Sequence, residues 1–130
     1  KKEGIKVIPS QNEQCAAIAA DAYSRIDNKY GVSIATSGPG IINLIQGIAC
    51  SYFDSIATMH ISGAVTTKQL RKNKKIRQVG FQEMEVVDLV KPITKYSVMI
   101  EKPDEIKLPE VIKKQSDIKI PDKMRYEIRS

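Results

Sequence analysis

The run from Ser10 to Gly40 limits the fold of this chain, because it joins a helix of small residues to a buried strand and a tight corner. The alanine-rich segment CAAIAADAY predicts a helix over residues 12–28 that packs closely on more than one side. VSIATS, over residues 32–37, has the β-branched composition of a strand inside a sheet. Gly38-Pro39-Gly40 then predicts a corner. The two glycines can adopt backbone conformations that other residues cannot, and the proline stiffens the corner.

The start of this helix carries a common capping pattern. Ser10 follows Pro9, and Glu13 stands three residues later, which is the Ser-x-x-Glu spacing of a capping box. In that interpretation the Glu13 carboxylate returns to a backbone donor near Ser10, and its role is structural.

The rest of the first half repeats the strand and helix rhythm. We predict a short strand over 6–8, a strand over 32–36, a helix over 41–53 that is buried on most faces, and a strand over 57–65. Strands and helices that alternate with short connections predict an α/β fold: a parallel sheet with helices on both faces.

The second half is less regular. We predict a short helix over 82–90 that stops before Pro92, a strand over 96–100, and a helix after Pro103 that Pro109 interrupts. Residues 116–130 show no amphipathic rhythm, so the expected organisation is one domain over 1–115 and an irregular tail over 116–130.

The net charge of +6 is confined to the second half of the chain. Residues 1–65 carry 5 basic and 5 acidic residues, whereas residues 66–130 carry 16 and 10. The densest cluster is KQLRKNKKIRQ, from Lys68 to Gln78. Such a cluster could bind a polyanion, but no aromatic residue interleaves it to stack on bases, so we expect a solvated surface loop and no nucleic-acid partner.

Cysteine and histidine are scarce. Cys15 and Cys50 lie in small-residue helical stretches, which predicts free, buried thiols and no disulfide or metal framework. His60 stands between apolar neighbours in a predicted strand, where a hydrogen-bonded core histidine is favoured over a catalyst. With no apolar run long enough for a membrane span and no signal pattern, we expect a cytoplasmic protein.

Four segments share their order and spacing with a known family. NEQCAAIAADAYSR, GVSIATSGPGIINLIQGIACSYFDSI, ISGAV and GFQE resemble the pyrimidine-binding domain of thiamine diphosphate-dependent enzymes of the acetolactate synthase type. The likeness covers about residues 5–105. It implies an incomplete domain, because the family's opening strand and helix, its closing strand and its separate diphosphate-binding domain have no counterpart in these residues.

The resemblance implies roles for particular residues. Glu13 would lie against the aminopyrimidine ring, in an apolar site that raises its proton affinity enough to share a proton with a ring nitrogen. Asn43 and the corner would line the pyrimidine pocket, and Phe81 and Gln82 would lie on the substrate side, often in the neighbouring subunit's site. The ordinary alternative is that Phe81 anchors the loop in the core and Gln82 opens a helix. The corner residues concerned are Thr36, Ser37, Gly38, Pro39 and Gly40.

The resemblance also implies the reaction. Such enzymes decarboxylate a 2-oxo acid, here pyruvate, and join the product to a carbonyl acceptor, which could be another pyruvate, an aldehyde or a modified sugar. They use thiamine diphosphate with Mg²⁺ held by the diphosphate-binding domain, and full-length members can carry FAD. The site forms in a dimer or tetramer, where that domain of a partner subunit faces this one, so we expect this chain alone to be inactive. The alternative is a non-catalytic remnant or binding module of the same fold.

Overall fold

The computed structural model describes residues 4–27, 29–73, 75–102 and 105. The chain divides into two units at Met99–Ile100, and the helices and strands below belong to the first. In chain order they are α1 (Glu13–Asp27), β1 (Gly31–Ala35), α2 (Pro39–Phe53), β2 (Thr58–Ser62) and α3 (Val86–Val90), with short 3-10 turns at Thr67–Gln69 and Lys91–Ile93.

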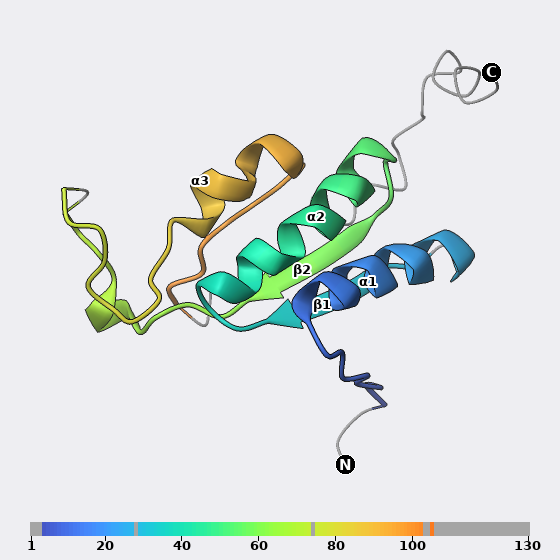
Figure 1. The fold of residues 1–130 in the computed structure, drawn as a ribbon, viewed down its shortest axis with the longest axis horizontal. Helices are drawn as coiled ribbons and strands as arrows, with labels where there is room; N and C mark the ends of the chain where they lie inside the picture. The colour runs from blue at the N-terminus through green and yellow to red at the C-terminus, as the bar shows by residue number, and fades with distance from the viewer. Residues whose placement is uncertain (1–3, 28, 74, 103–104, 106–130) are drawn as a thin grey trace. The chain divides into compact units, whose positions relative to one another are not determined.

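β1 and β2 form a parallel pair in the register Gly31 with Thr58 to Ala35 with Ser62, and α2 connects them. Inward positions alternate with exposed ones along β1, so that Ser33 is buried while Val32 and Ile34 are exposed. Figure 1 shows α1 over β1 and α2 over β2, on the same face of the sheet. The predicted α/β class and parallel sheet are therefore confirmed. Helices were expected on both faces of the sheet, whereas within the described residues the two long helices cover one face.

Small residues bring the elements of this unit together. A Cβ atom added to Gly47 of α2 would lie 2.4 Å from the Cβ of Ala17 in α1, and one added to Gly31 would lie 1.9 Å from the Ala20 carbonyl oxygen. α1 therefore packs closely on both α2 and β1, as its alanine content predicts. The buried apolar core consists of Ala17, Ala35, Ile41, Leu44, Ile48 and Val90.

The elements of the Ser10–Gly40 run and the helix after it form within two residues of their predicted bounds. The strand predicted over 57–65 is shorter and ends at Ser62. The prediction that α2 is buried on most faces is wrong, because only one stripe of it is buried and Ile42 and Phe53 are exposed.

Two predicted strands are wrong. Residues 6–8 and 96–100 form no strand, and their apolar side chains, such as Val7 and Val98, are exposed. A strand is stable only beside a neighbour that pairs its backbone, and neither segment has one among the described residues. The helix predicted over 82–90 begins only at Val86. The helix after Pro103, its interruption at Pro109 and the tail over 116–130 fall outside the described residues, apart from Glu105.

Cys15 and Cys50 are free, as predicted, but both are exposed, so the expected burial is wrong. The physical reason is the position of each cysteine around its helix axis, outside the buried face. The buried face of α1 runs through Ala17, Ala20 and Ser24, and Cys15 lies off that stripe. No helix in the described part of the chain is long and apolar enough to cross a membrane.

Candidate active site

The first turns of α1 and α2 lie beside the end of β1. The two helices run parallel, since side chains about thirty residues apart pair along their length: Glu13 with Asn43, Gln14 with Gln46, and Asp21 with Ser51. Both helices thus begin beside the carboxyl end of β1, which is the edge where ligands bind in parallel sheets.

The cap of α1 is Asn12, and the predicted capping box is wrong. The backbone N–H of Cys15 donates to Asn12 Oδ1 at 2.8 Å. Ser10 lies too far ahead of the first helical residue, Glu13, to be the cap. Asn12 therefore performs the capping role, and the Glu13 carboxylate is directed to another element.

Glu13 pairs with α2. Its Oε2 accepts a hydrogen bond from Asn43 Nδ2 at 3.0 Å, and its Oε1 would lie 3.4 Å from a Cβ on Gly40. The hydrogen bond from Asn43, with a smaller contribution from the Glu13 backbone N–H, lowers the pKa of this carboxyl. The expected apolar site with raised proton affinity is therefore not present in this chain, because Glu13 is only half-buried and Asn43 stabilises its ionised form.

The Gly-Pro-Gly corner meets the Phe81–Gln82 turn. Gly38 has φ 64°, and a Cβ there would lie 2.6 Å from both the Cβ and the carbonyl oxygen of Gln82. Only glycine fits so close an approach in this conformation. A Cβ on Gly63, after β2, would lie 3.2 Å from the Ser37 nitrogen, so the end of β2 also reaches the corner.

The other corner residues surround these contacts. Thr36 lies against Gly40, since a Cβ added to Gly40 would lie 3.0 Å from Thr36 Cγ2. Pro39 is exposed and Ser37 is half-buried. The structure thus brings Glu13 and Asn43 together with the corner.

Phe81 and Gln82 are the central residues of a turn that the Glu83 N–H closes on the Gly80 carbonyl at 3.2 Å. Phe81 is 81% exposed, so the alternative that it anchors the loop in the core is wrong. Gln82 precedes α3 by several residues and has φ 59°, so it does not open that helix. The Phe81–Gln82 turn therefore lies beside the corner of its own chain, with Gln82 in contact with Gly38.

Sequence reasoning missed Glu83. Its carboxylate accepts hydrogen bonds from the backbone N–H groups of Arg71, Val79 and Gly80. The available signal was its place at the end of GFQE, directly after a basic loop. That loop is exposed at Lys68, Lys72, Lys75 and Arg77, as expected for a surface segment.

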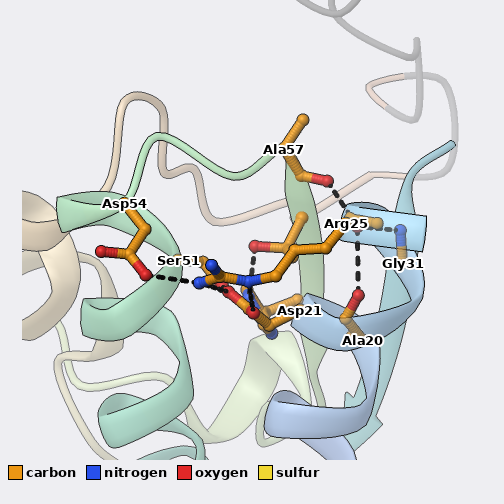
Figure 2. Close-up of polar contacts among 10 residues, drawn as sticks. Ala20, Asp21, Arg25, Gly31, Ser51, Asp54 and Ala57 are labelled. Atoms are coloured by element: carbon orange, nitrogen blue, oxygen red, sulfur yellow. Dashed lines mark hydrogen bonds and ion pairs between the residues drawn. The ribbon is translucent and has the colours of Figure 1, made fainter. Parts of the chain in front are cut away.

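Ion pairs join α1 and α2 towards their carboxyl ends (Figure 2). Arg25 lies between Asp21 of α1 and Asp54 at the end of α2, with nitrogen–oxygen distances of 2.5 Å to each carboxylate. Ser51 donates to Asp21 at 2.7 Å, and Asp21 is only 8% exposed. The hydrogen bond from Arg25 is the main cause that lowers the pKa of Asp21. This network fixes the register of α1 on α2, and so the pairing of Glu13 with Asn43.

His60 is a hydrogen-bonded histidine of the sheet, as predicted. Ser33 Oγ lies 2.7 Å from its Nδ1, and Thr58 Oγ1 lies 2.9 Å from its Nε2. Burial lowers the pKa of His60 to about 4. With both ring nitrogens occupied and the ring neutral at physiological pH, His60 belongs to the framework.

Comparison with known proteins places this arrangement in a family. Residues 1–89 match the family described as thiamine pyrophosphate enzyme, N-terminal TPP binding domain. The chain is 41% identical over 99 residues to the probable acetolactate synthase large subunit of Methanocaldococcus jannaschii, which covers 76% of this chain and 16% of that protein. It is 40% identical over 111 residues to the acetolactate synthase large subunit of Buchnera aphidicola from Acyrthosiphon pisum, covering 85% and 18%.

A third relative, the acetolactate synthase of Arthrospira platensis, is 39% identical over 108 residues, covering 83% of this chain and 17% of that protein. The chain thus spans less than a fifth of the length of these relatives. The family match covers more than half of this chain and includes Glu13, Asn43, the corner and the Phe81–Gln82 turn. The chain belongs to the family of N-terminal TPP-binding domains of thiamine pyrophosphate enzymes.

Proposed function

We propose that this chain is the pyrimidine-binding part of an acetolactate synthase-like enzyme, which decarboxylates pyruvate and joins the product to a carbonyl acceptor. The observation that carries the proposal is the pairing of Glu13 with Asn43 beside Gly40. It presents a carboxylate at the carboxyl end of a parallel strand. The names of the relatives, acetolactate synthases, support the reaction class.

The residues at this corner fit the aminopyrimidine part of thiamine diphosphate. A carboxylate can accept or share a proton at a ring nitrogen, and the glycines leave backbone groups open to close approach. When bound, thiamine diphosphate supplies the electron sink for decarboxylation. Glu13 would hold the proton at the ring nitrogen, and Asn43 would orient the carboxylate.

The low pKa of Glu13 has a consequence for assembly. A carboxylate with this hydrogen bond and partial exposure is a weak base. Covering the corner with a further domain would remove water and raise the pKa of Glu13 towards the range that proton sharing needs. We therefore expect the diphosphate-binding domain of a partner subunit, in a dimer or tetramer, to complete the site.

The substrate side would be formed by Phe81 and Gln82. The exposed Phe81 ring offers an apolar surface, and Gln82 offers an amide beside the corner. Pyruvate is the proposed donor, and the acceptor is a second pyruvate, an aldehyde or a modified sugar.

Further cofactors and the compartment belong to the same proposal. Among the described residues, no group of three or more His, Cys, Asp or Glu could hold a metal ion. We assign the Mg²⁺ ligands to the diphosphate-binding domain. FAD remains a possible further cofactor of the full-length protein. The exposed free thiols of Cys15 and Cys50 suit a reducing compartment, and the cytoplasm is the proposed location.

The test is pyruvate decarboxylation by the full-length protein with thiamine diphosphate and Mg²⁺, for the wild type and Glu13→Gln. We expect the variant to lose about 100-fold or more in kcat, because a positioned acid–base group contributes on that order. Circular dichroism checks that the variant stays folded. Retained turnover would remove Glu13 from the mechanism, and a wild type that binds no thiamine diphosphate would favour a non-catalytic module.

A further inference from the structure

The Glu83 carboxylate joins the two ends of residues 71–80, the loop that contains most of the basic cluster. Glu83 Oε1 accepts the backbone N–H of Arg71, and Oε2 accepts those of Val79 at 2.7 Å and Gly80 at 3.3 Å. Arg71 stands at one end of the loop, and Val79 and Gly80 stand at the other. These hydrogen bonds lower the pKa of Glu83, and the one from the Val79 N–H has the largest effect. The Glu83 carboxyl is therefore ionised at neutral pH. Glu83 therefore ties both ends of the loop together.

Arg71 closes the same loop by donating hydrogen bonds from its side chain. Its guanidinium donates to the carbonyl oxygens of Ile76 at 2.7 Å and Arg77 at 3.3 Å, and to the Glu85 carboxylate. The Arg71 side chain is 13% exposed, whereas Lys72 and Lys75 of the loop are exposed. Because the guanidinium donates hydrogen bonds to carbonyl oxygens of its own loop, we infer that Arg71 stabilises the conformation of this loop.

The Phe81–Gln82 turn follows this closed loop directly. Gln82 has φ 59°, a conformation that a residue with a side chain keeps only where its surroundings hold it. On one side, Gln82 contacts Gly38 of the corner. On the other side, the backbone and side chain of Glu83 are bound to Gly80 and the loop. The Gln82 conformation is thus fixed from both directions.

We propose that Glu83 is a positioning residue, which with Arg71 holds the Phe81–Gln82 turn against Gly38 and so sets the substrate side of the site. This inference rests on the proposed function, because it assigns Gln82 to substrate. Glu83 touches no reacting group in this arrangement and acts through Gln82.

The variant Glu83→Gln in the full-length, assembled protein tests this role. An amide keeps the shape but replaces one acceptor oxygen with a donor, which would then face a backbone N–H of the loop. The matched control is Glu85→Gln, because Glu85 bonds the Arg71 side chain and, among the described residues, accepts no backbone N–H of the loop. Gln82→Ala and the double variant Gln82→Ala/Glu83→Gln complete a mutant cycle.

We expect Glu83→Gln to raise KM for the carbonyl acceptor about tenfold, since small misplacements near a site have effects of this order or larger. Thiamine diphosphate binding, measured by fluorescence titration, should stay unchanged. Hydrogen exchange at the amides of Val79 and Gly80 should accelerate. In the Gln82→Ala background, Glu83→Gln should cause no further loss, because its effect passes through Gln82.

Several results with the Glu83 and Gln82 variants would overturn the inference. They are unchanged exchange at Val79 and Gly80, faster exchange with unchanged KM, and full additivity of the Gln82 and Glu83 variants. A Glu85→Gln variant with the same rise in KM would overturn it as well, since the effect would then be general to the loop. If the wild type lacks turnover, the proposed function fails and the positioning role with it, but the exchange data still decide whether Glu83 closes the loop.

Discussion

At the scale of single residues, the pairing of Glu13 with Asn43 determines what the site can do. Asn43 is the main cause of the low pKa of Glu13. The same hydrogen bond orients the carboxylate toward α2 and beside Gly40. Orientation and basicity are therefore coupled: the residue that places the carboxylate also makes it a weaker base.

Asn43→Ala should separate these two effects. Loss of the hydrogen bond raises the pKa of Glu13, since the ionised form loses its main stabilising partner. The measurement is a pH titration of the labelled Glu13 side-chain carboxyl by NMR in the absence of cofactor. Gln46→Ala is the control, because Gln46 also joins α2 to α1 but contacts Gln14. An unchanged pKa of Glu13 in Asn43→Ala would contradict this account.

His60 makes stability depend on pH. Its pKa is about 4 in the fold and 6.5 in the unfolded chain, so the unfolded state binds the proton first as pH falls. Stability should thus fall with pH between 6.5 and 4, with a loss of about 2 kcal/mol between pH 7 and pH 5. Urea unfolding at these two pH values measures it. His60→Gln should reduce that loss, and an equal loss in the variant would assign it to other groups.

Sequence reasoning found Glu13 and Asn43, but neither the hydrogen bond between them nor the residue that caps α1. The NEQCAAIAADAYSR motif identified the carboxylate, whereas Ser10 and Asn12 are both good capping residues. Which of them caps α1 depends on the residue at which the helix begins. Glu83 was missed because its role depends on hydrogen bonds from both ends of a loop, which no local pattern shows.

At the scale of elements, the close approach of α1 to α2 depends on Ala17 and Gly47. Gly47→Ala would place its Cβ 2.4 Å from the Ala17 Cβ and 3.0 Å from the Ala17 carbonyl carbon. Because the backbone must shift, we expect a loss of about 1–3 kcal/mol in the free energy of unfolding, despite the better helix propensity of alanine.

Denaturant unfolding of the full-length protein measures this loss, with Ile42→Ala as the control on the exposed side of the same helix. The control should have a smaller effect, since Ile42 is 48% exposed. A Gly47→Ala variant as stable as the wild type would show that the helices can separate without cost.

The elements differed in how well the sequence predicted them. α1, β1 and α2 follow from local composition, because alanine content, β-branched runs and the glycine–proline corner each favour one conformation. The segments 6–8 and 96–100 have strand-like composition but no partner strand among the described residues, and pairing is not a local property.

At the scale of the whole molecule, the site lies at an open edge. Glu13 is half-buried and Phe81 is exposed, and the outer face of the sheet presents Ile34 at 68% exposure. This chain spans less than a fifth of the length of its relatives. The proposed chemistry therefore requires a further domain that covers the corner, as the proposed assembly would supply.

The most direct test measures how fast the C2 proton of thiamine diphosphate exchanges with D₂O when the cofactor and Mg²⁺ are added to the full-length protein. NMR of quenched samples gives the rate for the wild type and Glu13→Gln at equal cofactor occupancy. We predict fast exchange in the wild type and a rate lower by about 100-fold or more in the variant, because Glu13 is the proposed proton partner. Equal rates at equal occupancy would contradict the assignment of Glu13 to the cofactor.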